Sequence, residues 1–159
     1  MNKQLLVEKI IASLAAGLQG YARSAQAAHA EATDEQSKAE NKYDTRGLEA
    51  SYLAHGQSRQ AAEVMQAIAQ YESLVLRAFG PKEPIDIGAI VEVERAGERA
   101  VYFIGPSAGG VEIECDGEPV LVITPQSPLS RQLIGHRQGK RLEVTIGHSR
   151  DRCHIVAVS

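Results

Sequence analysis

The chain has 159 residues, of which 43% are hydrophobic and 23% are charged, and its formal net charge is −3. This length allows one ordinary domain or two small ones, and the composition is that of a globular chain rather than a disordered one. The negative charge argues against binding that relies on neutralising nucleic-acid phosphates over the whole surface. No window approaches the roughly 18 apolar residues that span a bilayer, and no signal-peptide cleavage pattern follows Met1, so we expect a cytoplasmic protein without membrane contact.

Two stretches of the N-terminal half carry apolar or small residues at alternating spacings of three and four, which predicts a helix pair packed along its length. The first stripe is Leu14, Leu18, Tyr21, Ala25, Ala28 and Ala32. The second is Gly47, Ala50, Ala54, Gln57, Ala61, Val64, Ile68, Tyr71 and Val75. Capping residues between the stripes place a chain reversal near 33–41. We therefore predict an antiparallel α-helical coiled-coil hairpin over residues 1–78, with its tip near 33–41.

The C-terminal half has a different period. Gly80, Pro81 and Pro84 end the second arm and predict a linker over 79–86. Beyond it, alternating or short apolar runs predict strands at 89–94, 100–104, 109–114, 120–124, 141–146 and 154–158. Ser127 followed by Pro128 predicts the N-terminus of one short helix, which Gly135 closes. The fold class is therefore α+β, with a mostly antiparallel β domain over 87–159 that carries one short helix.

Acidic side chains gather at the predicted tip of the hairpin: Asp34, Glu35, Glu40 and Asp44 lie within eleven residues. Carboxylate oxygens suit Mg²⁺, which commonly takes one or two carboxylates and completes its shell with waters and a substrate phosphate. The alternative is structural, because Ser37 and Glu40 form a capping box at the start of the second helix. No phosphate loop, nucleophile elbow or Cys-x-x-Cys pair is present, and Cys153 with His154 matches no familiar zinc spacing. We expect no metal site belonging to the chain alone.

Basic residues are concentrated near the C-terminus, where Ser127 to Ser159 hold six basic and two acidic residues. The basic residues are Arg131, Arg137, Lys140, Arg141, Arg150 and Arg152. They either face an acidic partner surface or nearby nucleic acid, or form an ordinary solvated surface. In the first case binding weakens steeply with salt, since exposed charges are screened beyond ~8–10 Å at physiological ionic strength.

Two stretches of the second half resemble a known family. Residues 102–106, Tyr-Phe-Ile-Gly-Pro, and residues 127–144, which begin Ser-Pro-Leu-Ser-Arg and continue to Val144, are similar to the C-terminal domain of the GreA/GreB transcription elongation factors. Glu40-Asn41 resembles the acidic tip of that family's coiled coil. The resemblance implies a hairpin that enters the secondary channel of RNA polymerase and an FKBP-like domain that holds the channel rim.

The family's role carries over to particular residues here. The resemblance implies that Glu40 helps the polymerase hold a shared Mg²⁺, with Asp44 or Asp34 as the candidate second carboxylate, so that the polymerase cuts its own backtracked transcript. Ser37 stands where the family has an acid, which leaves two alternatives: stimulation of cleavage, or occupation of the channel without cleavage. Partner-binding residues are expected at Ser127, Pro128, Leu129, Arg131, Arg137, Lys140 and Arg141.

Either way, the resemblance implies an accessory factor rather than a free enzyme, with contact to nascent RNA or DNA only inside the complex. We expect a monomer, although the alanine-rich stripes would equally serve a neighbouring chain. A third hypothesis, prolyl isomerisation by the FKBP-like domain, ranks low because the second half holds few aromatic residues for a pocket wall.

Overall fold

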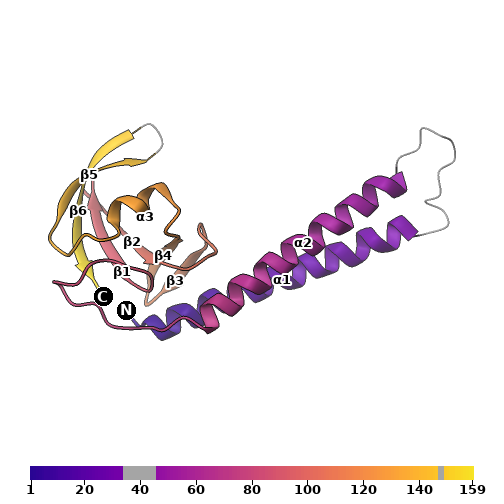
Figure 1. Ribbon diagram of the computed structural model, residues 1–159, viewed down its shortest axis with the longest axis horizontal. Coiled ribbons are helices and arrows are strands. Elements are labelled where there is room, and N and C mark those ends of the chain that lie inside the picture. The colour runs from indigo at the N-terminus through magenta and orange to yellow at the C-terminus, as the bar shows by residue number, and fades with distance from the viewer. Residues whose placement is uncertain (34–45, 147–148) are drawn as a thin grey trace. The chain divides into compact units, whose positions relative to one another are not determined.

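The computed structural model describes residues 1–33, 46–146 and 149–159. For residues 22, 25, 28, 31–33, 46–54, 146 and 149 it describes the backbone alone. The chain divides into two compact units (Figure 1). One unit contains Met1–Ile11 together with Gln70–Ser159, and the other is Ala12–Ala69. No helix among the described residues is both long and apolar enough to cross a membrane.

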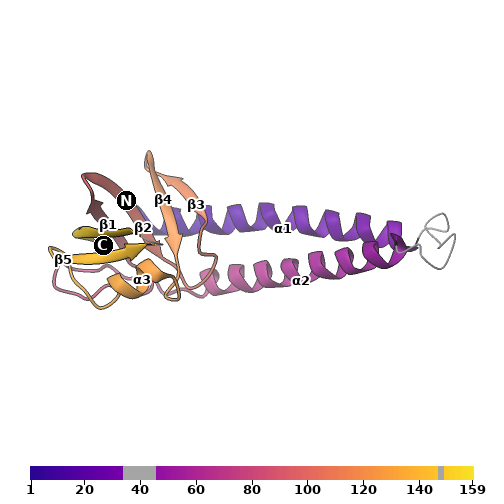
Figure 2. The same cartoon turned by 90° about the horizontal axis from the view of Figure 1, so that it is seen from above.

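The unit Ala12–Ala69 consists of most of two long helices, α1 (Lys3–Thr33) and α2 (Arg46–Glu72). The two helices run in opposite directions (Figure 1, Figure 2). Of the first predicted stripe, Leu14 is buried while Leu18 and Tyr21 are half-buried. The expectation for Val75 was wrong: α2 ends at Glu72, and Val75 lies beyond it with 84% of its surface exposed. The predicted tip lies outside the described residues.

The β domain is built on one six-stranded sheet with the order β3-β4-β2-β1-β6-β5. Its strands are β1 (Ile90–Arg95), β2 (Glu98–Ile104), β3 (Glu112–Cys115), β4 (Glu118–Ile123), β5 (Arg141–Ile146) and β6 (Ser149–Val158). The α+β class and the mostly antiparallel sheet are confirmed, since four of the five pairings between the described strands are antiparallel. β2 and β4 pair in parallel because the chain reverses in the β3–β4 hairpin before β4 reaches β2.

Two tight turns set the registers of the hairpins. Ala96 and Gly97 both have positive φ, 52° and 83°, between β1 and β2. Asp116 and Gly117 repeat this pattern between β3 and β4, with φ of 56° and 81°. Two successive residues of positive φ match the right-handed twist of the flanking strands, which is why such two-residue turns join hairpins.

The helix α3 (Pro128–Leu133) covers one face of the sheet. Ser127 caps it by accepting a hydrogen bond from the Ser130 backbone N–H, Pro128 occupies the first turn, and Gly135 follows with a φ of 83°. This confirms the predicted cap, start and closure. The core beneath it contains Phe79, Ile85, Ala89, Val91, Val93, Ile104, Ile123, Leu129, Leu133, Val144, Cys153, Ile155 and Val158.

The first turns of α1 belong to the same unit as the sheet. Leu6, Val7 and Ile10 are buried. Lys9 Nζ donates a hydrogen bond of 2.8 Å to the Glu114 carbonyl oxygen, and the Asn2 backbone N–H donates one of 3.1 Å to Asp116 Oδ2. The β3–β4 hairpin is therefore held by residues more than one hundred positions away in the sequence.

Phe79 lies against two cations near the start of the linker. The Lys3 ammonium is 4.6 Å and the Arg77 guanidinium 3.7 Å from the centre of its ring. Lys3 Nζ also donates to the Arg77 carbonyl oxygen at 2.6 Å, while Arg77 forms a 2.8 Å ion pair with Glu83. Burial, followed by the neighbouring Arg77 charge, lowers the pKa of Lys3 to about 8. The cluster ties the beginning of α1 to the segment that leads into the sheet.

Candidate partner-binding surface

The segment 134–140 joins α3 to β5, and hydrogen bonds hold it on both sides; we call it the strap. The Ile85 backbone N–H donates to the His136 carbonyl at 2.8 Å, and the Gly135 N–H donates to the Ile85 carbonyl at 2.9 Å. At its other end, the Gly139 N–H donates to the Ile155 carbonyl at 2.8 Å and the Ile155 N–H to the Lys140 carbonyl at 2.9 Å. The strap thus has a fixed backbone although most of its side chains are exposed.

The predicted basic residues take different positions around this strap. Arg131 lies exposed on α3, and Lys140 lies exposed where the strap meets β5. Arg137 is used structurally, because its Nε donates a 2.7 Å hydrogen bond to the Lys82 carbonyl. Arg141 lies on β5. Arg137 and Lys140 therefore lie on the strap and Arg141 follows on β5, each with an exposed side chain.

The other predicted partner-binding residues build α3. Ser127 is its cap, and Pro128 is exposed in the first turn. Leu129 is only 9% exposed and packs in the core, so its side chain does not face a partner. Of these three, only Pro128 offers its side chain fully to the surface.

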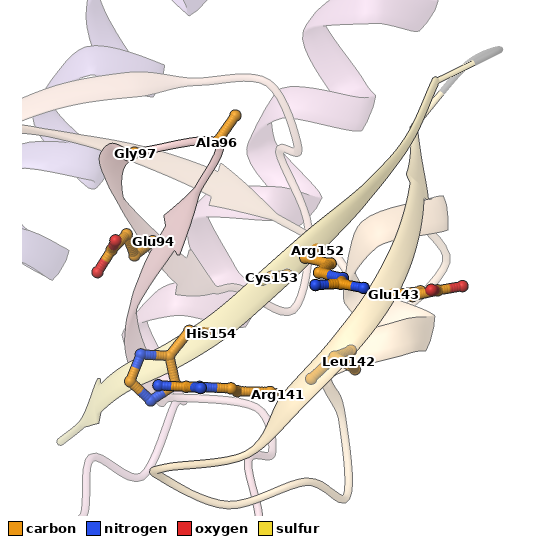
Figure 3. A pocket seen from close by; sticks show the side chains of 9 residues that line it. All are labelled: Glu94, Ala96, Gly97, Arg141, Leu142, Glu143, Arg152, Cys153 and His154. Atoms are coloured by element: carbon orange, nitrogen blue, oxygen red, sulfur yellow. The ribbon is translucent and has the colours of Figure 1, made fainter.

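A concave surface with a volume of about 480 Å³ crosses β1, β6 and β5 (Figure 3). We call it the groove. Its lining residues are Glu94, Ala96, Gly97, Arg141, Leu142, Glu143, Arg152, Cys153 and His154. Arg141 is the one predicted partner-binding residue among them, and the remaining predicted residues lie outside the groove.

The strand registers explain how the charges of the groove are arranged. Glu94 pairs with His154, and His154 pairs with Arg141, so an acid, an imidazole and a guanidinium occupy one row across three strands. Arg152 pairs with Glu143 two residues further along. In Figure 3 the Arg141 guanidinium lies beside the His154 ring, while the carboxylates of Glu94 and Glu143 point outward on opposite sides. The groove is basic in the middle and acidic at both margins.

The groove gives little support to metal binding or prolyl isomerisation. Burial raises the pKa of the Cys153 thiol, which opposes the thiolate form that binds metals. Among the described residues, no three His, Cys, Asp or Glu side chains gather closely enough to hold a metal ion. No Phe, Tyr or Trp lines the groove, and these are the walls that an isomerase pocket needs.

The predicted tip carboxylates Glu40, Asp44 and Asp34 lie outside the described residues. Their roles therefore stay predictions.

Sequence reasoning missed the groove as a site. Its members come from strands whose neighbours are distant in the sequence: β1 pairs with β6, some sixty residues later. The local signal was limited to the alternation of Arg150, Arg152 and His154 on the last strand, which predicts that Arg152 and His154 share a face. Nothing local indicated that Glu94 and Arg141 flank them.

Comparison with known proteins gives sequence relatives of one kind. No family model matches the chain. A transcription inhibitor protein Gfh1 of Thermus thermophilus is 29% identical over 123 residues, which cover 73% of this chain and 72% of the relative. Gfh1 of Thermus aquaticus is also 29% identical over 123 residues, covering 73% and 71%.

Among solved structures, the GreA factor homolog 1 (Gfh1) of Thermus thermophilus is 23% identical, covers 94% of both chains and has a TM-score of 0.38. The elongation factor GreA/GreB from Nitrosomonas europaea is 21% identical, covers 65% of this chain and 79% of that one, and has a TM-score of 0.37. The sequence relatives are thus transcription inhibitor proteins, to which this chain is similar at 29% identity over 73% of its length. The resemblance predicted from residues 102–106 and 127–144 is thereby confirmed.

The two stretches that carry the GreA/GreB resemblance have clear structural roles. Residues 127–144 comprise the cap and body of α3, the strap and the first part of β5. Residues 102–106 end β2, and a Cβ at Gly105 would collide with the Tyr71 hydroxyl and with Val122. The two stretches on which the resemblance was recognised therefore build the β domain.

Proposed function

We propose that this chain is a GreA/GreB-type regulator of transcription that binds RNA polymerase, with its β domain at the rim of the secondary channel and its helical tip inside the channel. The observation that carries the proposal is the similarity to proteins named transcription inhibitors over 73% of the chain. The two long helices α1 and α2 are consistent with it. The proposal includes two structural parts: the apolar stripes of α1 and α2 pack as an antiparallel coiled coil, and the β domain is FKBP-like.

The version without cleavage is the better supported of the two. Both Gfh1 relatives are named as inhibitors. Ser37 stands at a predicted tip position where an acid would be needed for a carboxylate pair. A hydroxyl carries no charge at neutral pH and contributes far less than a carboxylate to holding Mg²⁺. The protein is then a channel-occupying inhibitor that competes with cleavage-promoting factors.

The cleavage-promoting version assigns particular roles to the tip. Glu40 would supply a carboxylate oxygen to the Mg²⁺ of the polymerase, and Asp44 or Asp34 the second. The protein is an accessory factor in both versions, because any RNA cleavage belongs to the polymerase active site. It brings no cofactor of its own, meets nascent RNA or DNA only within the complex, works as a monomer, and acts where transcription occurs, in the bacterial cytoplasm.

The test uses the full-length chain with core polymerase and stalled, backtracked elongation complexes. Co-sedimentation measures binding, and the length of labelled RNA measures cleavage and elongation. We expect the wild type to bind, to slow elongation and to produce no cleavage products. Absence of binding would overturn the proposed function.

Two tip variants separate the versions. In the inhibitor version, Ser37→Asp introduces cleavage by restoring the missing carboxylate, and Glu40→Ala leaves cleavage at the background level. If the wild type instead stimulates cleavage and Glu40→Ala abolishes it, the cleavage-promoting version is correct. Ser37→Ala is the matched control, since it removes the hydroxyl without adding charge.

A further inference from the structure

We propose that the groove on β1, β6 and β5 binds a protein segment of the polymerase that carries a small cluster of carboxylates flanked by basic side chains. This inference rests on the proposed function and adds a binding site separate from the tip and from α3. Its central residues are Arg141, Arg152 and His154, and its margins are Glu94 and Glu143.

The central guanidinium groups are free to bind an anion. Among the described residues, neither Arg141 nor Arg152 has a carboxylate within ion-pair distance, and both side chains are exposed. By contrast, Arg77, Arg95 and Arg99 of the same unit each pair with an acid. A guanidinium offers a planar set of donors that matches a carboxylate or phosphate, so two unpaired ones on adjacent strands form a suitable anion site.

The sheet fixes these groups in position. Arg141 and Arg152 lie within paired strands, and the backbone on both sides of Lys140 is bonded to Ile155. A partner therefore meets cationic groups whose backbone is already ordered, which lowers the entropic cost of binding. Only the long side chains need to be immobilised.

The acidic margins decide which kind of anion fits. A nucleic-acid strand carries a charge at every nucleotide, so a strand crossing the groove would bring phosphates close to Glu94 or Glu143. Nucleic-acid sites that lack base readout also use aromatic side chains for stacking, and no Phe, Tyr or Trp lines the groove, where the His154 imidazole is the single ring. A protein segment can instead place acidic side chains over the centre and basic side chains over the margins. A partner with another arrangement of charges would bring like charges together and bind less well.

The experiment compares polymerase binding by the wild type, Arg141→Ala/Arg152→Ala and a matched control, Lys82→Ala/Arg99→Ala, at several salt concentrations. The control removes the same charge from exposed side chains of the same unit outside the groove. We expect the groove variant to bind at least about tenfold more weakly and to lose part of its salt dependence. The control should stay within about twofold of the wild type. Circular dichroism melting verifies that each variant folds.

The outcomes are distinguishable. Equal binding by the groove variant and the wild type overturns the groove inference and leaves the proposed function standing. A wild type that does not bind polymerase overturns both, because the occupant named here is a polymerase segment.

A second arm tests the alternative anion. Glu94→Lys/Glu143→Lys should weaken polymerase binding, because new lysines would face the partner's bases. A gain in binding would overturn the inference, because it would mean that no basic side chains of the partner face Glu94 and Glu143. Loss of RNA-oligonucleotide binding in the Arg141→Ala/Arg152→Ala variant alone would identify a nucleic-acid strand as occupant and would also overturn it.

Discussion

The side-chain amide of Gln132 occupies the outer edge of β5 at Thr145. Its Oε1 accepts a hydrogen bond of 2.8 Å from the Thr145 N–H, and its Nε2 donates one of 3.0 Å to the Thr145 carbonyl oxygen. Nε2 also donates to the Pro128 carbonyl at 2.7 Å. One residue of α3 thus takes the place of a neighbouring strand at an edge that would otherwise expose backbone groups.

Replacing Gln132 with Ala should lower the free energy of unfolding by about 1–2 kcal/mol, because both bonds to Thr145 are lost and each contributes about 1 kcal/mol. The measurement is urea unfolding followed by circular dichroism. Gln138→Ala is the control, since Gln138 is exposed in the strap. An unchanged midpoint for Gln132→Ala would show that water replaces the amide without cost.

The Ala96–Gly97 turn predicts opposite effects at adjacent positions. Ala96 has a φ of 52°, a conformation that Asn adopts more readily than Ala, so Ala96→Asn should raise the free energy of unfolding by about 0.5–1 kcal/mol. Gly97 has a φ of 83°, so its replacement by Ala should lower the free energy of unfolding by about 1 kcal/mol. Thermal unfolding of the two variants checks both signs. Shifts in the same direction would contradict this account of the turn.

Gly105 should not tolerate a side chain. A Cβ there would meet the Tyr71 hydroxyl and lie 2.9 Å from Val122 Cγ1. Tyr71 is 1% exposed and donates a 2.8 Å hydrogen bond to the Ser107 carbonyl, so it has little room to move. We expect Gly105→Ala to cost about 1–3 kcal/mol in an unfolding titration.

Gly109→Ala is the comparison for Gly105→Ala. A new Cβ at position 109 would approach only Thr124, whose Cγ2 would lie 3.2 Å away. Gly109→Ala should lower the free energy of unfolding by less than Gly105→Ala does. Equal losses of unfolding free energy would show that the Tyr71 side chain moves to relieve the clash.

The lowered pKa of Lys3 predicts that the free energy of unfolding depends on pH. Its folded-state pKa of about 8 is below the ordinary value of 10.5, because burial opposes the charged form. Between about pH 8 and 10.5 the unfolded chain therefore binds more protons at this site, so the contribution of Lys3 to stability rises with pH and is lost as pH falls through 8. The difference in unfolding free energy between the wild type and Lys3→Met should grow over this range. A constant difference would mean that Lys3 is protonated equally in both states.

Local signals in the sequence predicted much of the fold. The cap, first turn and closure of α3 follow from Ser127, Pro128 and Gly135. Each of these residue types favours its position in a helix for a local reason, independent of the rest of the fold. Arg141–Ile146 was predicted with the bounds that it has in the structure. Alternation located β1 to β4 to within three residues at each end, because it reports which face of the sheet a side chain occupies. The last strand was predicted too short, since β6 begins at Ser149 and not at 154.

The alternation of side chains does not show which strands pair when they lie far apart in the sequence. The parallel contact of β2 with β4 and the neighbourhood of β1 and β6 depend on how distant segments meet. The groove depends on that pairing, so its row of Glu94, His154 and Arg141 was not predictable. Val75 failed for a different reason: the three-four spacing continued past Glu72, where the helix ends.

The grouping of Met1–Ile11 with Gln70–Ser159 has a consequence for synthesis on the ribosome. Residues 1–11 leave the exit tunnel before the segment that they contact. The hydrogen bonds of Lys9 and Asn2 cannot form until Glu114 and Asp116 have been synthesised. During that interval the buried side chains of Leu6, Val7 and Ile10 have no completed unit to enter. The nascent chain therefore exposes an apolar segment until most of the sheet has emerged from the ribosome.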